Sequence, residues 1–182
     1  IIGEREKLLL RGDIMKLAEH FDSSEFACKC GCGGNKIDQR LVDMLERLFK
    51  LMNARVIIVT SGYRCPTHSV RVGGSTSDAH TMGYAADIKV QKQNGSWYTA
   101  EDIAEAAERI GFGGIGLMSG ACHVDIRHLG GYKNSHWFGD ERTGNDNIST
   151  FQRGTKFEGE VATAPAKSKI QLIVDGKTVY SS

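Results

Sequence analysis

Two histidines and one aspartate stand out as groups that could hold a metal ion. His80 and Asp87 lie seven residues apart in SDAHTMGYAADIKV, and His123 opens the run HVDIR. Two imidazoles and one carboxylate form a ligand set of catalytic zinc and leave the fourth coordination position open to water. If the fold brings the three side chains together, the sequence predicts a catalytic metal site.

Strands are the elements that would position these groups. The run CHVDIR alternates, which places His123, Asp125 and Arg127 on one face while its apolar residues point into the core. The run DIKV, which begins at Asp87, reads as a strand entered from a loop. If the two strands are neighbours, Asp87 meets His123, a turn brings His80 to them, and the intervening glycine and alanines let the backbones approach closely.

Two amphipathic helices and further short strands are predicted around this pair. Asp38 is a suitable N-cap for a helix over 39–53 with apolar residues at three- and four-residue steps, and Thr99 caps a second helix that stops at Gly111. RVIIVT predicts a buried strand, and GGIGLM predicts a strand hinged to CHVDIR near Ser119. The predicted class is α+β: a small antiparallel sheet flanked by helices, with the metal site on the sheet face.

The composition of the chain changes near residue 140. Residues 1–140 hold the elements above and are predicted to begin with a helix over 4–20. Residues 141–182 read as loop and linker, followed by a β-hairpin turned at Asp175 and Gly176. We expect a main domain over 1–140 and a C-terminal extension over 141–182.

The charge pattern excludes several classes of partner. The 23 basic and 22 acidic residues are spread along the chain and give a formal charge of +1, so no basic stripe is available for nucleic acid. No apolar run approaches the roughly 20 residues of a transmembrane helix. The opening IIGEREKLLLRGD carries charges where a signal peptide would be apolar, so we expect a soluble chain whose leader has already been removed or never existed.

Five cysteines leave several interpretations open. Cys28, Cys30 and Cys32 crowd into CKCGC, whereas Cys65 and Cys122 are distant in sequence. The first three and Cys65 could form a structural zinc knot, although the spacing matches no common zinc finger well. A disulfide from the cluster to Cys65 is the alternative outside a reducing compartment, and buried thiols are the third.

Several ordered motifs carry a resemblance to a known family. The run SGYRCPTHSVRVGGSTSDAHTMGYAADI, followed by GGIGLM and HVDIR, resembles the zinc peptidases of the M15 type. This family includes bacterial D-alanyl-D-alanine carboxypeptidases and phage endolysin peptidases, and the hedgehog signalling domain is similar to it in fold. The upstream EFACKCGCGGNKIDQRLVDMLERL resembles the head of one branch, so the resemblance extends from Phe21 to Trp137.

The resemblance implies roles for individual residues. His80, Asp87 and His123 would be the zinc ligands, and Arg64 of SGYR would bind a carboxylate or carbonyl of the substrate and act in catalysis, a task suited to its planar guanidinium. Trp137 would wall the binding cleft.

The chain also departs from the family pattern. Many relatives have a serine two residues before the first ligand histidine, where this chain has Asp78 with Ser77 one step further back, so both are candidate substrate-binding residues. The segment before His123 lacks the acidic general base of many relatives. Asp125 could be that catalytic base, or could instead orient an imidazole or Arg127. The weaker alternatives for the base are His128 and His136.

The function implied by the resemblance is zinc-dependent hydrolysis of a peptide bond in the stem peptides of bacterial peptidoglycan. The bond would be D-Ala-D-Ala, L-Ala-D-Glu or a cross-bridge. A monomer that is secreted, cell-wall associated or released by a phage at lysis is expected. One alternative is a non-catalytic, zinc-stabilised module that binds cell wall. Another is a cysteine hydrolase using Cys30 or Cys122, for which no motif supplies a partner histidine.

Overall fold

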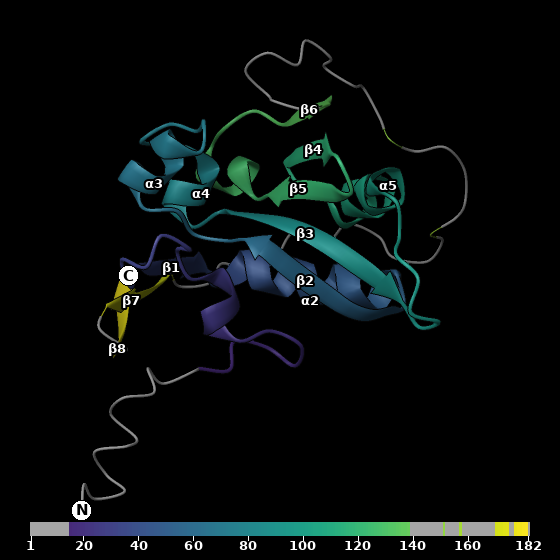
Figure 1. Cartoon of the computed structure of the whole chain (residues 1–182), viewed down its shortest axis with the longest axis horizontal. Helices are drawn as coiled ribbons and strands as arrows, with labels where there is room; N and C mark the ends of the chain where they lie inside the picture. The colour runs from purple at the N-terminus through teal and green to yellow at the C-terminus, as the bar shows by residue number, and fades with distance from the viewer. Residues whose placement is uncertain (1–14, 139–150, 152–156, 158–169, 175–176, 182) are drawn as a thin grey trace, which may run out of the picture.

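Five strands form the central sheet of the computed structural model, which describes residues 15–138, Phe151, Phe157, 170–174 and 177–181 (Figure 1). The strand order is β2-β3-β5-β4-β6. The bounds are β2 Ala54–Ser61, β3 Ala85–Lys92, β4 Gly114–Met118, β5 Ala121–Asp125 and β6 Ser135–Phe138. Because β6 runs parallel to β4, the sheet is mixed rather than fully antiparallel as predicted, while the predicted α+β class is confirmed.

Two helices cover one face of this sheet. Helix α2 (Gln39–Leu51) packs against β2, and α5 (Ala100–Ile110) packs against β3, β4 and β5 as well as against α2. The predicted caps are present, since the side chains of Asp38 and Thr99 accept from backbone amides of the first turns and Gly111 closes α5 in the left-handed conformation. The apolar stripes of both helices form the hydrophobic core with the inward residues of the sheet.

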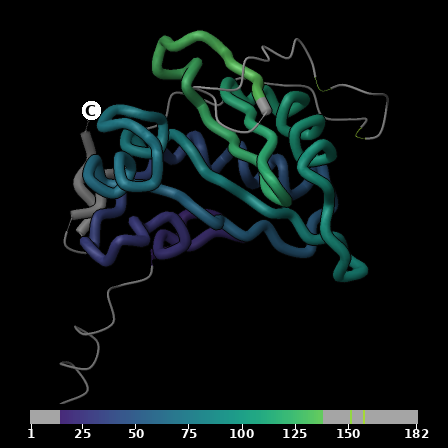
Figure 2. The backbone as a smooth tube through the Cα atoms, turned by 45° about the horizontal axis from the view of Figure 1, so that its top comes forward, coloured from purple at the N-terminus to yellow at the C-terminus, as the bar shows by residue number. Residues whose placement is uncertain are grey.

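Short helices lie at one end of the sheet. Helix α3 (Pro66–Arg71) and helix α4 (Ala79–Met82) fill the connection between β2 and β3, and a 3-10 turn η2 (Arg127–Gly130) follows β5. Figure 2 shows α3 and α4 at one end of the sheet and α5 toward the other. The connections that contain α3 and α4 therefore lie together at the end of the sheet where β3 begins.

The predicted helix over 4–20 is wrong for its described part, and residues 1–14 lie outside the described residues. Lys16 forms a bridge with Asp22, and the amide of Leu17 donates to the carbonyl oxygen of Phe21 (3.0 Å). These bonds run from an earlier amide to a later carbonyl, opposite to the helical direction. Phe21 is fully buried, so a tight turn that inserts this ring into the core replaces the helix. The 3-10 turn η1 (Ser23–Phe26) follows.

Strand β2 also differs from its prediction. It is one of the two edge strands of the sheet and buries only one face, since Val56 and Ile58 on the other face remain 37% and 42% exposed. The prediction of a strand from RVIIVT is therefore confirmed, but the prediction that this strand is buried is wrong for its outer face.

A second, three-stranded sheet joins β1 (Asn35–Asp38) to the predicted C-terminal hairpin (Figure 1). Strands β7 (Ile170–Val174) and β8 (Lys177–Ser181) pair antiparallel, and β7 pairs with β1. The predicted turn residues Asp175 and Gly176 lie outside the described residues, and the division of the chain near residue 140 stays a prediction. Within the described part of the chain, no helix is long and apolar enough to cross a membrane.

Candidate metal centre

One row of residues crosses all five strands of the central sheet. Ser61 pairs with Asp87, Asp87 with His123, His123 with Gly116, and Gly116 with Trp137. Because side chains alternate along a strand, the neighbours of these residues on β3, β4 and β5 point to the opposite face, where they join the core. The neighbouring-strand register expected for Asp87 and His123 is therefore present.

His80 reaches this row from helix α4. The side chain of Asp78 caps the helix, and Gly83 ends it with a φ of 77°. His80 Nδ1 donates to the carbonyl oxygen of Gly62 (2.7 Å), and since a carbonyl can only accept, the proton lies on Nδ1. In the neutral ring, the lone pair on Nε2 therefore points at the row.

Three candidate ligand atoms, on His80, Asp87 and His123 (the triad), converge from different elements. His123 Nδ1 lies 2.9 Å from Asp87 Oδ1 and 3.2 Å from His80 Nε2, and the last two atoms are 3.4 Å apart. With metal bonds of about 2.0 to 2.1 Å, the edges of a tetrahedral zinc site measure about 3.3 Å. The spacing of the three atoms therefore fits one small cation.

Each ligand of the triad has a polar partner behind it. Arg64 Nη2 donates to Asp87 Oδ2 (2.5 Å), which leaves Oδ1 toward the histidines. His123 Nε2 donates to Asp125 Oδ2 (3.1 Å), and Arg127 Nη2 donates to the same carboxylate (2.7 Å). Such partners fix the tautomer and the orientation of metal-binding imidazoles. Both histidines thus present an unprotonated nitrogen to one point when neutral.

The carboxylates around His123 favour the protonated form of its imidazole. Burial alone would lower the pKa of His123, but hydrogen bonds to Asp125 and Asp87 raise it to about 9. Burial would raise the pKa of Asp87, yet hydrogen bonds from His123 and His80 hold it well below its usual range. A proton on His123 Nδ1 thus occupies the position that a cation would take.

Zinc affinity at this site is therefore expected to depend steeply on pH. Each zinc ion must displace the proton of His123, so the affinity should fall about tenfold for each pH unit below about 9. Competition with a chromophoric chelator, corrected for the protonation of the chelator, measures this slope. Equal affinities at about pH 6.5 and about pH 8.5 would contradict the proton competition.

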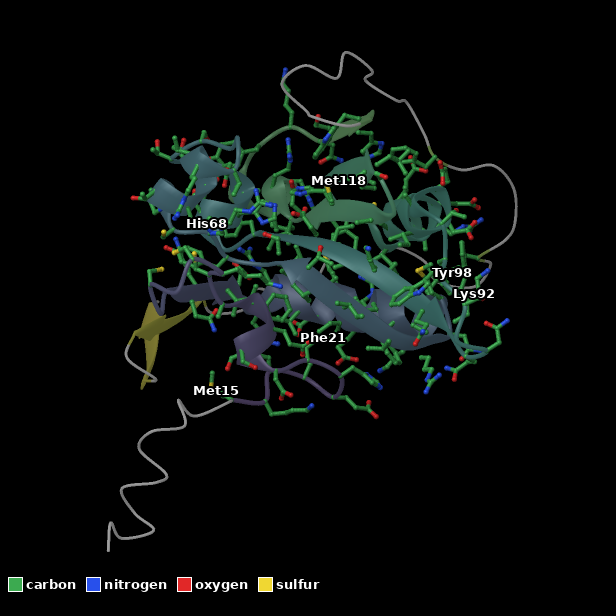
Figure 3. The ribbon with its side chains drawn as sticks, viewed as in Figure 1. Met15, Phe21, His68, Lys92, Tyr98 and Met118 are labelled. Atoms are coloured by element: carbon green, nitrogen blue, oxygen red, sulfur yellow. The ribbon has the colours of Figure 1, made fainter. Side chains whose placement is uncertain are left out.

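A cavity of about 580 Å³ opens beside the triad. Its polar and aromatic lining residues are Arg64, Ser75, Asp78, His80, Asp87, Ser119, His123, Arg127 and Trp137. The Trp137 ring packs on His123 with centroids 5.1 Å apart, and the Arg127 guanidinium lies 5.2 Å from the Trp137 ring centroid. Met118, labelled in Figure 3, lines the cavity from the end of β4. The volume is in the range of ordinary ligand pockets.

Two glycines of β4 leave space for Trp137, Asp125 and Arg127, a role that was not predicted from the sequence. A Cβ on Gly116 would lie 2.5 Å from the Trp137 indole, and a Cβ on Gly114 would meet the Asp125 carboxylate and the Arg127 side chain. The spacing G-x-G in GGIGLM was the available signal, since neighbouring side chains can lean over a strand position that has none.

The predicted site residues fall into two groups. Arg64, Asp78, His80, Asp87, His123 and Trp137 line the cavity, and Ser77, Asp125, His128 and His136 are not among its lining residues. Ser77 is exposed on the loop before α4, and its neighbour Ser75 lines the cavity instead. Asp125 is fully buried beneath His123.

The carboxylate of Asp78 is already engaged by the protein. It accepts from the amides of Thr81 (2.9 Å) and Ser75 (3.1 Å) and from the hydroxyl of Ser69. These bonds lower its pKa against the effect of burial. Asp78 therefore shapes the loop around the cavity through its own hydrogen bonds.

The two cysteines considered as nucleophiles are placed differently from the triad. Cys122 is fully buried, and burial raises the pKa of its thiol, which suppresses the reactive thiolate. Cys30 lies among other thiols and does not line the cavity. Neither position supports a cysteine hydrolase at this cavity.

Two imidazoles and a carboxylate converging beside a cavity on one face of a sheet define the class of candidate metallohydrolases. The family model described as Peptidase M15 matches residues 19–126, more than half of the chain, and this range includes all three candidate ligands. The chain therefore belongs to the peptidase M15 family, and this membership supports a peptidase activity. No curated protein matches the chain.

Proposed function

We propose that the protein is a zinc peptidase that hydrolyses peptide bonds in the stem peptides of bacterial peptidoglycan. The convergence of His80 Nε2, Asp87 Oδ1 and His123 Nδ1 beside a solvent-accessible cavity carries this proposal. Since the substrate lies outside the cytoplasm, we further propose a monomer that is secreted, cell-wall associated or released at phage lysis.

Zinc held by the triad would lower the pKa of a water molecule from about 15.7 to about 7 and would polarise the scissile carbonyl. The protein side chains would bind and orient the substrate. Arg64 and Arg127 both line the cavity while each is held by a buried carboxylate, Asp87 and Asp125 respectively. Two fixed guanidinium groups suit a peptide that presents carbonyl oxygens and a terminal carboxylate.

Asp125 is proposed to position His123 rather than to accept the proton of the attacking water. Its carboxylate is fully buried and receives bonds from His123, from the side chain of Arg127 and from the Arg127 amide (2.8 Å). Within the described residues, the carboxylates that line the cavity are Asp78 and Asp87. Asp78 accepts hydrogen bonds from the loop before α4 and from α4 itself, and Asp87 is one of the three candidate metal ligands.

Replacing Asp125 by asparagine distinguishes the two roles. The amide oxygen of asparagine can still accept from His123 Nε2, but the negative charge of the carboxylate is lost. A positioning role therefore predicts a loss of zinc affinity of about 10-fold to 100-fold, as is usual when such a partner is replaced. Hydrolysis should then recover when zinc is added to saturation. A general base would instead show a loss on the order of 10² to 10⁴ in kcat at unchanged zinc affinity. Chelator competition and saturating-zinc kinetics on the same preparation measure both quantities.

The proposed function is tested on purified peptidoglycan. Digestion followed by mass spectrometry of the muropeptides should show new stem-peptide termini, lost with a chelator and restored by zinc. The mass of each product identifies the bond that is cut. A zinc-stabilised module that only binds cell wall would co-sediment with peptidoglycan and release no fragment under any of these conditions, and that result would overturn the proposal.

A further inference from the structure

Four cysteine sulfurs gather beside helix α3 in a group that shares no residue with the triad. Cys28 Sγ lies 3.4 Å from Cys30 Sγ, and Cys30 Sγ lies 3.7 Å from Cys65 Sγ. Together with Cys32, all four sulfurs lie within 4.8 Å of one another. Figure 3 shows these sulfur atoms beside His68, whose Nδ1 is 3.3 Å from Cys28 Sγ. The pairs are too far apart to be disulfides, which require about 2.05 Å.

The spacing of the sulfurs fits a single tetrahedral ion. With zinc–sulfur bonds of about 2.3 Å, the edges of a tetrahedron of four thiolates measure about 3.8 Å. The two measured separations, 3.4 and 3.7 Å, are close to that edge. Uncharged thiols have no strong attraction that would hold four sulfurs at this distance, whereas a divalent cation provides one.

Backbone amides point at the sulfurs as they would at thiolates. The amide of Cys65 donates to Cys28 Sγ (3.3 Å), that of His68 to Cys65 Sγ (3.4 Å), and that of Gly34 to Cys32 Sγ (3.4 Å). Three of the four candidate ligands thus receive an amide hydrogen bond, which favours the deprotonated, metal-binding form.

The chain is shaped to bring the two parts of this cluster together. Gly31 and Gly33 adopt φ values of 83° and 72°, which turn the CKCGC segment back on itself. The amide of Tyr63 donates to the carbonyl oxygen of Phe26 (2.8 Å), and a Cβ on Gly62 would lie 2.5 Å from the Phe26 backbone. A side chain at position 62 would therefore separate the CKCGC segment from the turn that carries Cys65.

We propose that Cys28, Cys30, Cys32 and Cys65 bind a second, structural zinc ion, separate from the one at the triad. Cys65 follows Arg64 directly and caps helix α3, so this ion fastens the N-terminal segment to the turn that presents Arg64. The same helix contributes Ser69, which holds Asp78 at the cavity. His68 donates to the Cys28 thiolate from outside the coordination shell.

Metal content measured by elemental analysis tests this proposal on the full chain, prepared with reductant and zinc. Two zinc ions per chain are expected for the unaltered protein and one for the double variant His80→Ala/His123→Ala. One is also expected for Cys30→Ser/Cys65→Ser, and two for the matched cysteine control Cys122→Ala, whose thiol lies in the core. The one ion that Cys30→Ser/Cys65→Ser should remove, and the one ion that His80→Ala/His123→Ala should retain, are both independent of hydrolysis and of metal at the triad, so failure of the proposed function would leave these two results unchanged.

Cobalt substitution supplies a readout that needs no cysteine variant to fold. Cobalt bound to the His80→Ala/His123→Ala protein should show intense thiolate-to-metal charge-transfer bands in the near ultraviolet, because the remaining ligands are sulfurs. A histidine double variant that retains no zinc and shows no such band overturns the proposal. Mass spectrometry of the unreduced, alkylated protein that finds Cys65 in a disulfide, with no metal retained, overturns it equally.

Discussion

Replacing His80 by alanine is expected to reduce peptidoglycan hydrolysis by on the order of 10³-fold at ordinary zinc concentrations. The variant loses the Nε2 that lies 3.2 Å from His123 Nδ1, so two candidate ligands remain. A metal in such a site supplies several kcal/mol of transition-state stabilisation, and each 1.36 kcal/mol corresponds to a factor of ten in rate. The rate of muropeptide release and the zinc content of the same preparation measure the effect.

A matched histidine serves as the control for this variant. The exposed His20 lies before α2, forms a hydrogen bond from its Nδ1 to Glu46 Oε2 (2.8 Å), and is not among the residues that line the cavity. His20→Ala should keep its zinc and its rate within about twofold, as is usual for surface substitutions. If His80→Ala hydrolyses peptidoglycan as fast as His20→Ala does, the triad is not the catalytic centre.

Arg64→Ala is expected to have the second largest effect, a loss on the order of 10² to 10³ in kcat/KM. The change removes a cavity-lining guanidinium and also leaves the buried Oδ2 of Asp87 without its 2.5 Å partner. Truncating one member of a buried, hydrogen-bonded charge pair costs about 2 to 5 kcal/mol. Steady-state kinetics on a synthetic stem peptide, with zinc content determined in parallel, measure the loss.

Two further variants interpret the Arg64 result. Arg64→Lys keeps the charge but not the planar fork, so it should recover only part of the activity. Arg55→Ala removes an exposed arginine from the edge strand β2, which ends three residues before Arg64, and should leave kcat/KM unchanged. A full recovery by lysine would show that charge alone, rather than bidentate geometry, is what the site requires.

The strand pair that carries the triad could be predicted because its signal is local. In HVDIR the two-residue alternation decides which side chains share a face, and the same rule placed Asp87 opposite His123 once the strands were neighbours. The helices α2 and α5 were predictable for a similar reason, since their caps and apolar stripes are written in consecutive residues.

Depth and cross-strand packing could not be read in the same way. Alternation put Asp125 on the face of His123 but gave no information on burial, and the side chain lies beneath the imidazole because Gly114 leaves space on the next strand. Gly116 of β4 leaves space for Trp137 of β6, and this contact depends on a strand pairing that the local sequence does not show. The tight turn at residues 15–20 likewise depends on burial of the Phe21 ring in the core. This tertiary contact overrides a weak helical pattern in the sequence.

The interleaving of ligands and core residues along single strands limits how the gene can vary. Deleting one residue from β3 or β5 would move every following side chain of that strand to the opposite face of the sheet. Ile88 or Val124 would then point away from the core, and a carboxylate or imidazole would point into it. Insertions and deletions should therefore be tolerated in the turn at residues 92–98 and in the other connections, whereas the number of residues in β3 and in β5 should stay constant.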